Sequence, residues 1–174
     1  SLNKFEQYVV INNFGLSNAS KEAELVLRED YEAGSMTGNA SIASSEEMDK
    51  KFKRQIVKLK KLDEIFLSNY NFGWVDLIKV DLEGHEDSFF EGSIKFILKH
   101  KPFILFELNK KFYTTRNIFD FDNLFFKPIT SLGYDLYLLK NKLVNLKTLN
   151  DLPNMTNIIA SPIEKCQRIE RFLK

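Results

Sequence analysis

Apolar and polar residues alternate in short blocks along the first third of the chain. Apolar runs over 8–14 and 23–28 predict two strands, because each run is short and bounded by turn-forming residues. Residues 29–51 form a polar segment rich in Gly, Ser and Ala, and its lack of periodicity favours a flexible loop. The next apolar patterns predict a strand over 55–59 and a short amphipathic helix over 62–67.

The centre of the chain has the pattern of a strand–helix–strand unit. A strand over 75–80 runs into a charged turn over 81–84. A helix is expected over 85–100, because apolar residues recur there every three or four positions. Pro102 ends that helix, and residues 103–108 form a nearly unbroken apolar strand. Such continuous runs are typical of parallel sheets, so we expect two parallel strands joined by a right-handed crossover.

The last third of the chain predicts a loop, a helix and an antiparallel edge. Pro128 is expected to bend or split the helix. The expected elements are a loop over 109–117, a helix over 122–132, a strand pair over 134–140 and 143–146, a strand over 156–161 and a closing helix over 163–173. The predicted fold class is therefore α/β in a single domain over residues 1–174, with a mainly parallel sheet and an antiparallel C-terminal edge.

Composition narrows the functional classes. Hydrophobic residues make up 44% and charged residues 28% of the chain, which excludes a disordered chain and a disulfide scaffold. The net charge of +1 argues against a nucleic-acid partner. One cysteine and two histidines make a zinc site unexpected. No apolar stretch approaches the roughly 20 residues of a membrane span and no signal peptide is visible, so we expect a cytoplasmic protein without membrane contact.

Ionisable residues that are candidates for a functional site lie where the central strands end. In open α/β sheets, ligands bind beyond the carboxyl ends of the strands. Asp81 ends the central strand, Glu83 and His85 follow it, and Glu107 lies near the end of the next strand. These four ionisable groups are candidates for one site. The alternative is that Glu83 and His85 are solvated turn residues and that Glu86 only caps the helix.

Lys79 interrupts a strand that is otherwise suited to burial. Residues two apart on a strand share a face, so Lys79 points the same way as Asp81. Either Asp81 or Glu107 pairs with it, or its amino group reaches solvent at an edge. Asp81, Glu83 and Glu107 are also oxygen ligands suited to magnesium, although three carboxylates serve a base or a salt bridge equally well. The sequence holds no phosphate-binding loop, nucleophile elbow or dinucleotide fingerprint.

Two blocks of the sequence carry a family resemblance. Residues 57–65 read VKLKKLDEI, and residues 75–86 read VDLIKVDLEGHE. Gly92 and the strand KPFILFE over 101–107 follow at matching positions, and NFGLSN over 13–18 resembles an upstream turn. Together these motifs resemble the FkbM-type methyltransferase family over most of the chain.

The resemblance implies a Rossmann-like fold that moves a methyl group from S-adenosylmethionine to a hydroxyl of a small molecule or sugar. It implies that cofactor contacts come from the turn beside the adenine and from the end of the central strand, at Leu16, Ser17, Asn18 and Asp81. By position, the groups that orient or deprotonate the acceptor are Asp81, Glu83, His85 and Glu107.

The sequence also departs from the family pattern. Such enzymes open with a strand, a Gly-rich turn, a helix and a second strand that ends in an acidic ribose ligand, and this sequence has no counterpart of them. We therefore expect a C-terminal portion that lacks the first strand–helix–strand unit, or a degenerate relative. The alternative function is a non-catalytic methyltransferase-like module that acts through partner contacts. That module would expose an apolar sheet edge, and a homo-oligomer is one way to cover it.

Overall fold

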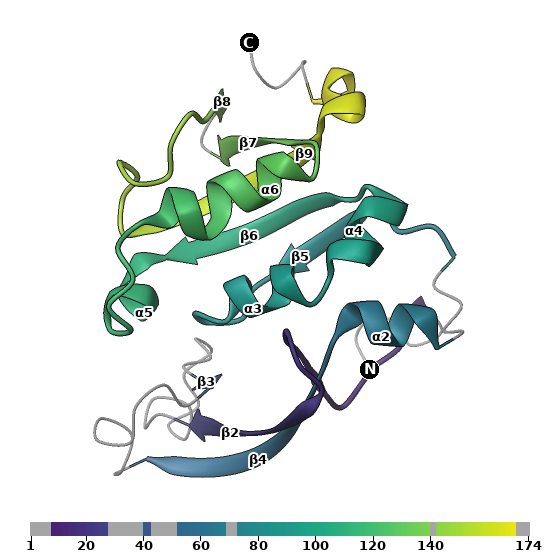
Figure 1. Ribbon diagram of the computed structural model, residues 1–174, viewed down its shortest axis with the longest axis vertical. Coiled ribbons are helices and arrows are strands. Elements are labelled where there is room, and N and C mark those ends of the chain that lie inside the picture. Colours follow the sequence, from purple (N-terminus) through teal and green to yellow (C-terminus); the bar gives the residue numbers. More distant parts are fainter. Residues whose placement is uncertain (1–7, 28–39, 43–51, 69–72, 140–141, 170–174) are drawn as a thin grey trace.

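The computed structural model describes residues 8–27, 40–42, 52–68, 73–139 and 142–169. In this described part, the strands form two sheets with helices between and beside them (Figure 1). The first sheet has the order β1-β4-β2-β3, and the second has the order β5-β6-β9-β7-β8. The chain is thus a mixed α/β protein, and the predicted fold class is confirmed at that level.

The first sheet is built from the N-terminal part of the chain. Only β1 and β4 run parallel in it, while β2 pairs antiparallel with both β3 and β4. The strands are β1 (Gly15–Leu16), β2 (Lys21–Leu27), β3 (Ala40–Ile42) and β4 (Lys53–Lys60). The strands predicted over 23–28 and 55–59 are therefore confirmed and are longer than expected, apart from residue 28, which lies outside the described residues.

Two predictions for this region are wrong. Residues 8–14 form no strand in the described structure, because backbone pairing with β4 begins only at Gly15. Residues 8–11 are apolar yet exposed, with Ile11 90% exposed. The segment predicted as a loop over 29–51 contains β3 at residues 40–42, and the rest of that segment lies outside the described residues.

The second sheet is mixed and mostly antiparallel. β5 and β6 form the predicted parallel pair, and β7 pairs with β8 as the predicted antiparallel edge. β9 lies between β6 and β7 and is antiparallel to both, so the expectation of a mainly parallel sheet is wrong. The strands are β5 (Leu77–Val80), β6 (Phe103–Asn109), β7 (Tyr134–Leu139), β8 (Leu143–Asn145) and β9 (Met155–Pro162). Burial alternates along β6, so its apolar run does not mark a strand buried on both faces.

The helices match the predictions in part. The helical stretches are α2 (Leu62–Leu67), α3 (Glu86–Glu91), α4 (Ile94–His100), α5 (Lys110–Thr114), η2 (Asp122–Phe126), α6 (Lys127–Ser131) and η3 (Ile163–Arg168). The helix over 62–67 is confirmed. The helix expected over 85–100 is broken at residues 92–93, and the loop expected over 109–117 contains α5. The helix expected over 122–132 is present and is not split at Pro128: η2 ends at Phe126 and α6 follows directly from Lys127.

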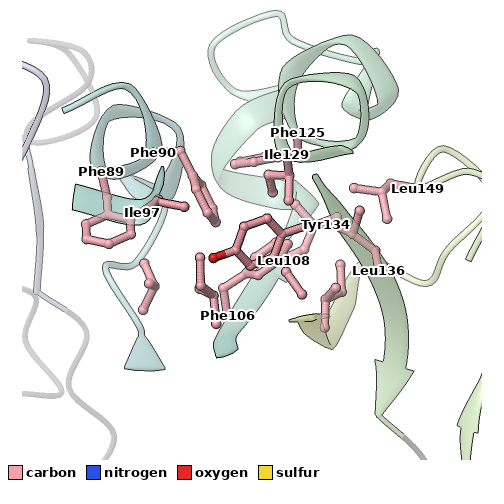
Figure 2. Close-up of a cluster of buried hydrophobic side chains, with 14 of the residues drawn as sticks. Phe89, Phe90, Ile97, Phe106, Leu108, Phe125, Ile129, Tyr134, Leu136 and Leu149 are labelled. Atoms are coloured by element: carbon pink, nitrogen blue, oxygen red, sulfur yellow. The ribbon is translucent and has the colours of Figure 1, made fainter. Parts of the chain in front are cut away.

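The main core lies between the second sheet and the helices that cover one of its faces. Figure 1 shows α3, α4 and α6 along that sheet, and Figure 2 shows side chains from these helices meeting those of β6 and β7. Phe89, Phe106 and Phe125 are each 1% exposed, so part of the high phenylalanine content serves packing. Tyr134 is equally buried, and its hydroxyl donates to the Pro102 carbonyl at 3.0 Å.

One side chain ties the first half of the fold to the second. Asp63 on α2 accepts hydrogen bonds from the backbone N–H groups of Lys95 at 3.0 Å and Phe96 at 2.8 Å. It therefore caps α4, whose own N-cap residue Ser93 makes no side-chain cap in the described structure. The backbone N–H of Asp63 also donates to the carbonyl of Gly92 at 3.0 Å. These bonds fix α2, and with it β4, against the α3–α4 pair.

Candidate functional site

A pocket of about 290 Å³ lies between the first sheet and the turn that follows β5. One side of it is formed by strands of the first sheet, and the other by residues 81–85. The lining residues are Gly15, Leu16, Leu25, Ala40, Ser41, Ile42, Val57, Leu59, Asp81, Leu82, Glu83 and His85. The pocket therefore brings together three of the four predicted catalytic residues, Asp81, Glu83 and His85.

Asp81 is held at the rim of the pocket by an ion pair. Lys79 Nζ lies 2.5 Å from Asp81 Oδ2, and the two side chains are 62% and 43% exposed. The hydrogen bond from Lys79 to Asp81 raises the pKa of the lysine. Lys79 thus pairs with Asp81 while its amino group also reaches solvent on the edge strand β5, so each of the two alternatives that the sequence left open holds in part. The pair orients a carboxylate that still faces the pocket.

The turn after Asp81 has an unusual backbone. Glu83 and Gly84 both have positive φ angles, 51° and 92°. A Cβ atom on Gly84 would lie 2.4 Å from Cβ of Phe112, so both the φ angle and the space require glycine there. This conformation turns the chain sharply between β5 and α3. Glu83 and His85 consequently face the same pocket from neighbouring positions.

Glu86 holds this turn from inside the protein. It is only 2% exposed, and its carboxylate accepts hydrogen bonds from the backbone N–H groups of Leu82 at 2.9 Å and Gly84 at 3.2 Å. The hydroxyl of Tyr113 on α5 donates a further hydrogen bond to it. Burial raises the pKa of Glu86. Glu86 therefore organises the turn rather than simply capping α3, a role that the sequence pattern did not indicate.

A second buried contact supports the same turn. Arg116 Nη2 donates to Asp87 Oδ2 at 2.6 Å, and Nη1 donates to the carbonyl of Gly84 at 3.1 Å. Asp87 is 8% exposed, and this hydrogen bond raises the pKa of Arg116. Sequence reasoning missed both residues, because Arg116 lies in a segment predicted as a loop and 29 positions from Asp87.

His85 links the pocket to the predicted cofactor turn. Its Nε2 atom lies 2.9 Å from Ser17 Oγ, and burial lowers the pKa of the imidazole. Ser17 is 1% exposed, so its hydroxyl faces His85 rather than the pocket. The side-chain amide of Asn18 donates to Glu91 Oε2 at 2.7 Å. Of the predicted cofactor turn, only Leu16 lines the pocket. Ser17 and Asn18 are fixed against α3 and stay predictions as cofactor ligands.

A comparison with protein families identifies the family of the chain. The family model described as the methyltransferase FkbM domain matches residues 2–136. The chain belongs to the FkbM methyltransferase family. No curated protein and no solved structure matches it significantly. The matched range includes every residue that lines the pocket.

In this FkbM family member, Glu107 does not line the pocket. It lies on β6, two positions beyond Leu105, which pairs with Lys79. Its charge contributes only a minor part of the raised pKa of Lys79. Among the described residues, no group of three or more His, Cys, Asp or Glu side chains is placed to hold a metal ion. The magnesium alternative built on Asp81, Glu83 and Glu107 therefore gains no support.

The described part of this methyltransferase-family chain contains no helix with both the length and the apolar character needed to cross a membrane.

Proposed function

We propose that this chain transfers the methyl group of S-adenosylmethionine to a hydroxyl group of a small molecule or sugar. The observation that carries the proposal is the pocket between Leu16 and the turn at residues 81–85, in a chain of the FkbM methyltransferase family. That pocket joins an apolar surface to ionisable groups. Such a combination is typical of sites that bind a small ligand and act on it.

The residues of the pocket fit part of the cofactor. Leu16 offers an apolar surface to an adenine ring, and Asp81 offers a carboxylate to hydroxyl groups, and both line the same cavity. Carboxylate–hydroxyl hydrogen bonds of this kind are stronger than neutral ones. S-adenosylmethionine supplies an electrophilic methyl group on a sulfonium sulfur. Leu16 and Asp81 are the residues that we expect to hold it.

The protein's own task in this reaction is alignment and proton removal. The acceptor oxygen forms a bond to the methyl carbon while the carbon–sulfur bond breaks, and the electron pair of that bond stays on sulfur. The hydroxyl proton passes to a base on the protein. In-line transfer of this kind gains mainly from holding the reacting atoms in position. A positioned carboxylate or imidazole adds general-base catalysis.

Asp81 is our first choice for the base, with Glu83 and His85 as neighbours that orient the acceptor. Lys79 fixes one oxygen of Asp81, and the other stays available to a ligand at the rim. Burial lowers the pKa of His85, which favours its neutral form near neutral pH. Neutral imidazole accepts hydrogen bonds from hydroxyl groups. Glu107, outside the pocket, acts at most through Lys79.

A specific observation also favours the second candidate, a non-catalytic module that acts through partner contacts. Large apolar side chains are exposed at the edge strand β5 and at the start of the described chain, where Leu77 is 62% and Val10 78% exposed. Exposed apolar surface of this kind marks contact sites. A second copy of the chain is one partner that fits it. A cytoplasmic location, consistent with a single cysteine, belongs to either candidate.

Cofactor binding distinguishes the two candidates. Titration calorimetry of the folded chain with S-adenosylhomocysteine is expected to show binding, and Asp81→Asn is expected to weaken it at least about tenfold. Asp76→Asn is the matched control, because it removes the same charge from an exposed position five residues earlier. Saturable binding that depends on Asp81 supports the enzyme. A folded chain that does not bind S-adenosylhomocysteine, or whose two variants bind it equally well, contradicts the enzyme proposal.

A further inference from the structure

The pocket has two unlike walls, and the wall formed by the first sheet is mostly apolar, with Ser41 as the polar residue among those that line it. Leu25 on β2 pairs with Ile42 on β3, and Val57 and Leu59 follow on the same face of β4. Side chains at alternate positions of neighbouring strands share one face of a sheet. The strands β2, β3 and β4 therefore give the pocket a wall in which the branched aliphatic side chains of Leu25, Ile42, Val57 and Leu59 predominate, and we call these four residues the aliphatic wall.

The opposite wall carries the ionisable groups. Asp81, Glu83 and His85 come from the single turn after β5 and face the cavity together. Glu86 and Arg116 hold that turn in place by hydrogen bonds to its backbone. A ligand between the two walls meets hydrocarbon on one side and carboxylate or imidazole on the other.

The aliphatic wall extends well beyond the predicted cofactor end of the pocket. Leu59 pairs with Gly15, next to Leu16, and so marks the cofactor end. Leu25 pairs with Gln55, four residues along β4 from Leu59. At about 3.3 Å per residue, Leu25 lies about 13 Å from the level of Leu59. The far part of the wall is thus available to the acceptor rather than to an adenine beside Leu16.

We propose that the acceptor is an apolar ring compound that carries a hydroxyl group, such as a phenol or an alicyclic alcohol, and not a sugar. This inference rests on the proposed function. A sugar ring would press several hydroxyl groups against Leu25, Ile42 and Val57, whose side chains carry no hydrogen-bonding group to compensate for the loss of water. An apolar ring gains from the same contact, while its single hydroxyl meets the ionisable wall.

The size of the cavity supports a compact acceptor. A volume of about 290 Å³ lies at the lower end of the range for ligand sites. The cavity accepts a small fused ring more readily than an extended chain of sugars. We therefore choose 2-naphthol as the apolar probe and methyl β-D-glucopyranoside as the sugar probe, because each is a small ring compound with at least one hydroxyl group.

The first experiment compares these two probes on the 174-residue chain saturated with S-adenosylhomocysteine. Titration calorimetry, or chemical shifts of the methyl groups of Leu, Ile and Val, reports the affinity of each probe. We expect 2-naphthol to bind at least about tenfold more tightly than the glucoside. A glucoside that binds as tightly as 2-naphthol overturns the proposal.

Paired variants on one strand test whether the aliphatic wall is responsible. Val57→Asn places an amide in the wall, whereas Ile56→Asn changes the neighbouring residue, which points to the opposite face and is 60% exposed. We expect Val57→Asn to weaken 2-naphthol binding about tenfold and Ile56→Asn to leave it unchanged. Leu25→Asn gives the same test from β2 if Val57→Asn does not fold. Weakening by both Val57→Asn and Ile56→Asn overturns the assignment of the wall.

S-adenosylhomocysteine separates this inference from the function on which it rests. Affinity for it is expected to be the same in Val57→Asn and in the unchanged chain. An equal loss of both ligands in Val57→Asn assigns the aliphatic wall to the cofactor and overturns the proposal. If the folded chain binds no S-adenosylhomocysteine, the methyltransferase proposal fails. Titration of the cofactor-free chain with 2-naphthol then still tests whether the aliphatic wall binds an apolar ring. Weaker binding by Val57→Asn supports that assignment, and unchanged binding overturns it.

Discussion

Glu86 is a carboxylate enclosed by backbone donors and a tyrosine hydroxyl. Its neighbours Leu82 and Gly84 belong to the turn that lines the pocket, so the carboxylate sets the positions of Asp81, Glu83 and His85 without touching the cavity itself. Burial raises the pKa of Glu86, and four compensating hydrogen bonds oppose that effect without cancelling it. Glu86 is therefore a positioning residue.

Replacing Glu86 by alanine is expected to destabilise the protein by about 3 kcal/mol. Two backbone N–H groups and the Tyr113 hydroxyl would lose their acceptor inside the protein, and each loss is costly. Glu86→Gln keeps one acceptor oxygen and is expected to cost about 1 kcal/mol. Urea denaturation followed by circular dichroism measures both. Glu91→Ala is the control, because Glu91 is exposed on the same helix, and a cost there equal to that of Glu86→Ala would contradict the argument.

His100 is a buried residue of α4 with a polar ring. It is 4% exposed, and neither ring nitrogen has a hydrogen-bond partner among the described residues. Its ring stacks on Phe96 with centroids 4.3 Å apart and lies near Phe66 and Trp74. Burial lowers the pKa of His100. The folded protein therefore favours the neutral imidazole more strongly than the unfolded chain does.

Replacing His100 by phenylalanine is expected to stabilise the protein by about 1 kcal/mol at pH 7, since an unpaired buried polar group is removed. The pH dependence should also change. Because the pKa of His100 is lower in the folded state, its contribution is full above about pH 6.5 and is lost as the pH falls through the lowered value. Urea denaturation between pH 5 and pH 7 should thus show a flatter profile for His100→Phe. An unchanged profile would contradict this.

Among helices and strands, α4 depends on a cap that comes from another helix. Asp63 on α2 accepts from two N–H groups at the start of α4, whereas the hydroxyl of Ser93, the residue in the N-cap position, has no partner among the described residues. Asp63→Ala is expected to cost about 1 kcal/mol of stability, and Ser93→Ala close to none. Thermal unfolding of the two variants measures the difference. A larger cost for Ser93→Ala would show that the local residue is the true cap.

The break between α3 and α4 at Gly92 also depends on contacts with a distant segment of the chain. A Cβ atom on Gly92 would lie 2.0 Å from the carbonyl oxygen of Ser17, so the helix end lies directly against the predicted cofactor turn. Gly92→Ala is expected to cost about 3 kcal/mol, and to weaken S-adenosylhomocysteine binding because residues 16–18 must move. The control is Gly73→Ala, which has a strained φ of 59° but open space, and is expected to cost about 1 kcal/mol. Equal costs would show that packing at Gly92 is not decisive.

The sequence patterns correctly predicted those helices and strands whose formation depends on residues close together in the sequence. The amphipathic helix over 62–67 and the strand pair β7–β8 were predicted closely, because their periodicity and turn residues lie within a few positions. The sequence patterns did not predict α5, because its residues are mostly polar. In the structure, Tyr113 is 0% exposed, and the amino group of Lys110 donates to the carbonyls of Asn150 and Leu152. Those partners lie 40 or more positions away, beyond the reach of a local pattern.

The candidate site was predicted to a similar extent. Because ligands bind beyond the carboxyl ends of strands, Asp81, Glu83 and His85 were expected to share one site, and all three line one pocket in the structure. The same expectation also included Glu107, because it treats the carboxyl ends of neighbouring strands as equivalent. β6 continues to Asn109 and pairs with β9 there, so Glu107 lies within a sheet instead of at its end. Which strands continue past a site depends on partners distant in sequence.

For the molecule as a whole, the core is unevenly distributed between the two sheets. In the first sheet, the buried hydrophobic residues are Val26 and Leu59, while Ile56 is 60% exposed. The second sheet packs Val80, alternate residues of β6 and parts of β7 and β9 into the main cluster of buried side chains. Stability in proteins follows such local differences in buried apolar contact. The first sheet, which carries the aliphatic wall, should therefore open more easily than the second.

Hydrogen exchange followed by mass spectrometry or NMR tests this difference. Amides of β2 and β4 are expected to exchange at least about tenfold faster than those of β6 and β9, because opening them exposes less apolar surface. Since the pocket lies between the two sheets, a ligand that bridges its walls must stabilise the weaker one. Saturating S-adenosylhomocysteine should then slow exchange at residues 15–17 and 81–85, and 2-naphthol should slow it in β2 and β4. The same exchange in both sheets of the free chain would contradict the uneven core. Protection by 2-naphthol confined to β6 and β9 would place the ligand elsewhere.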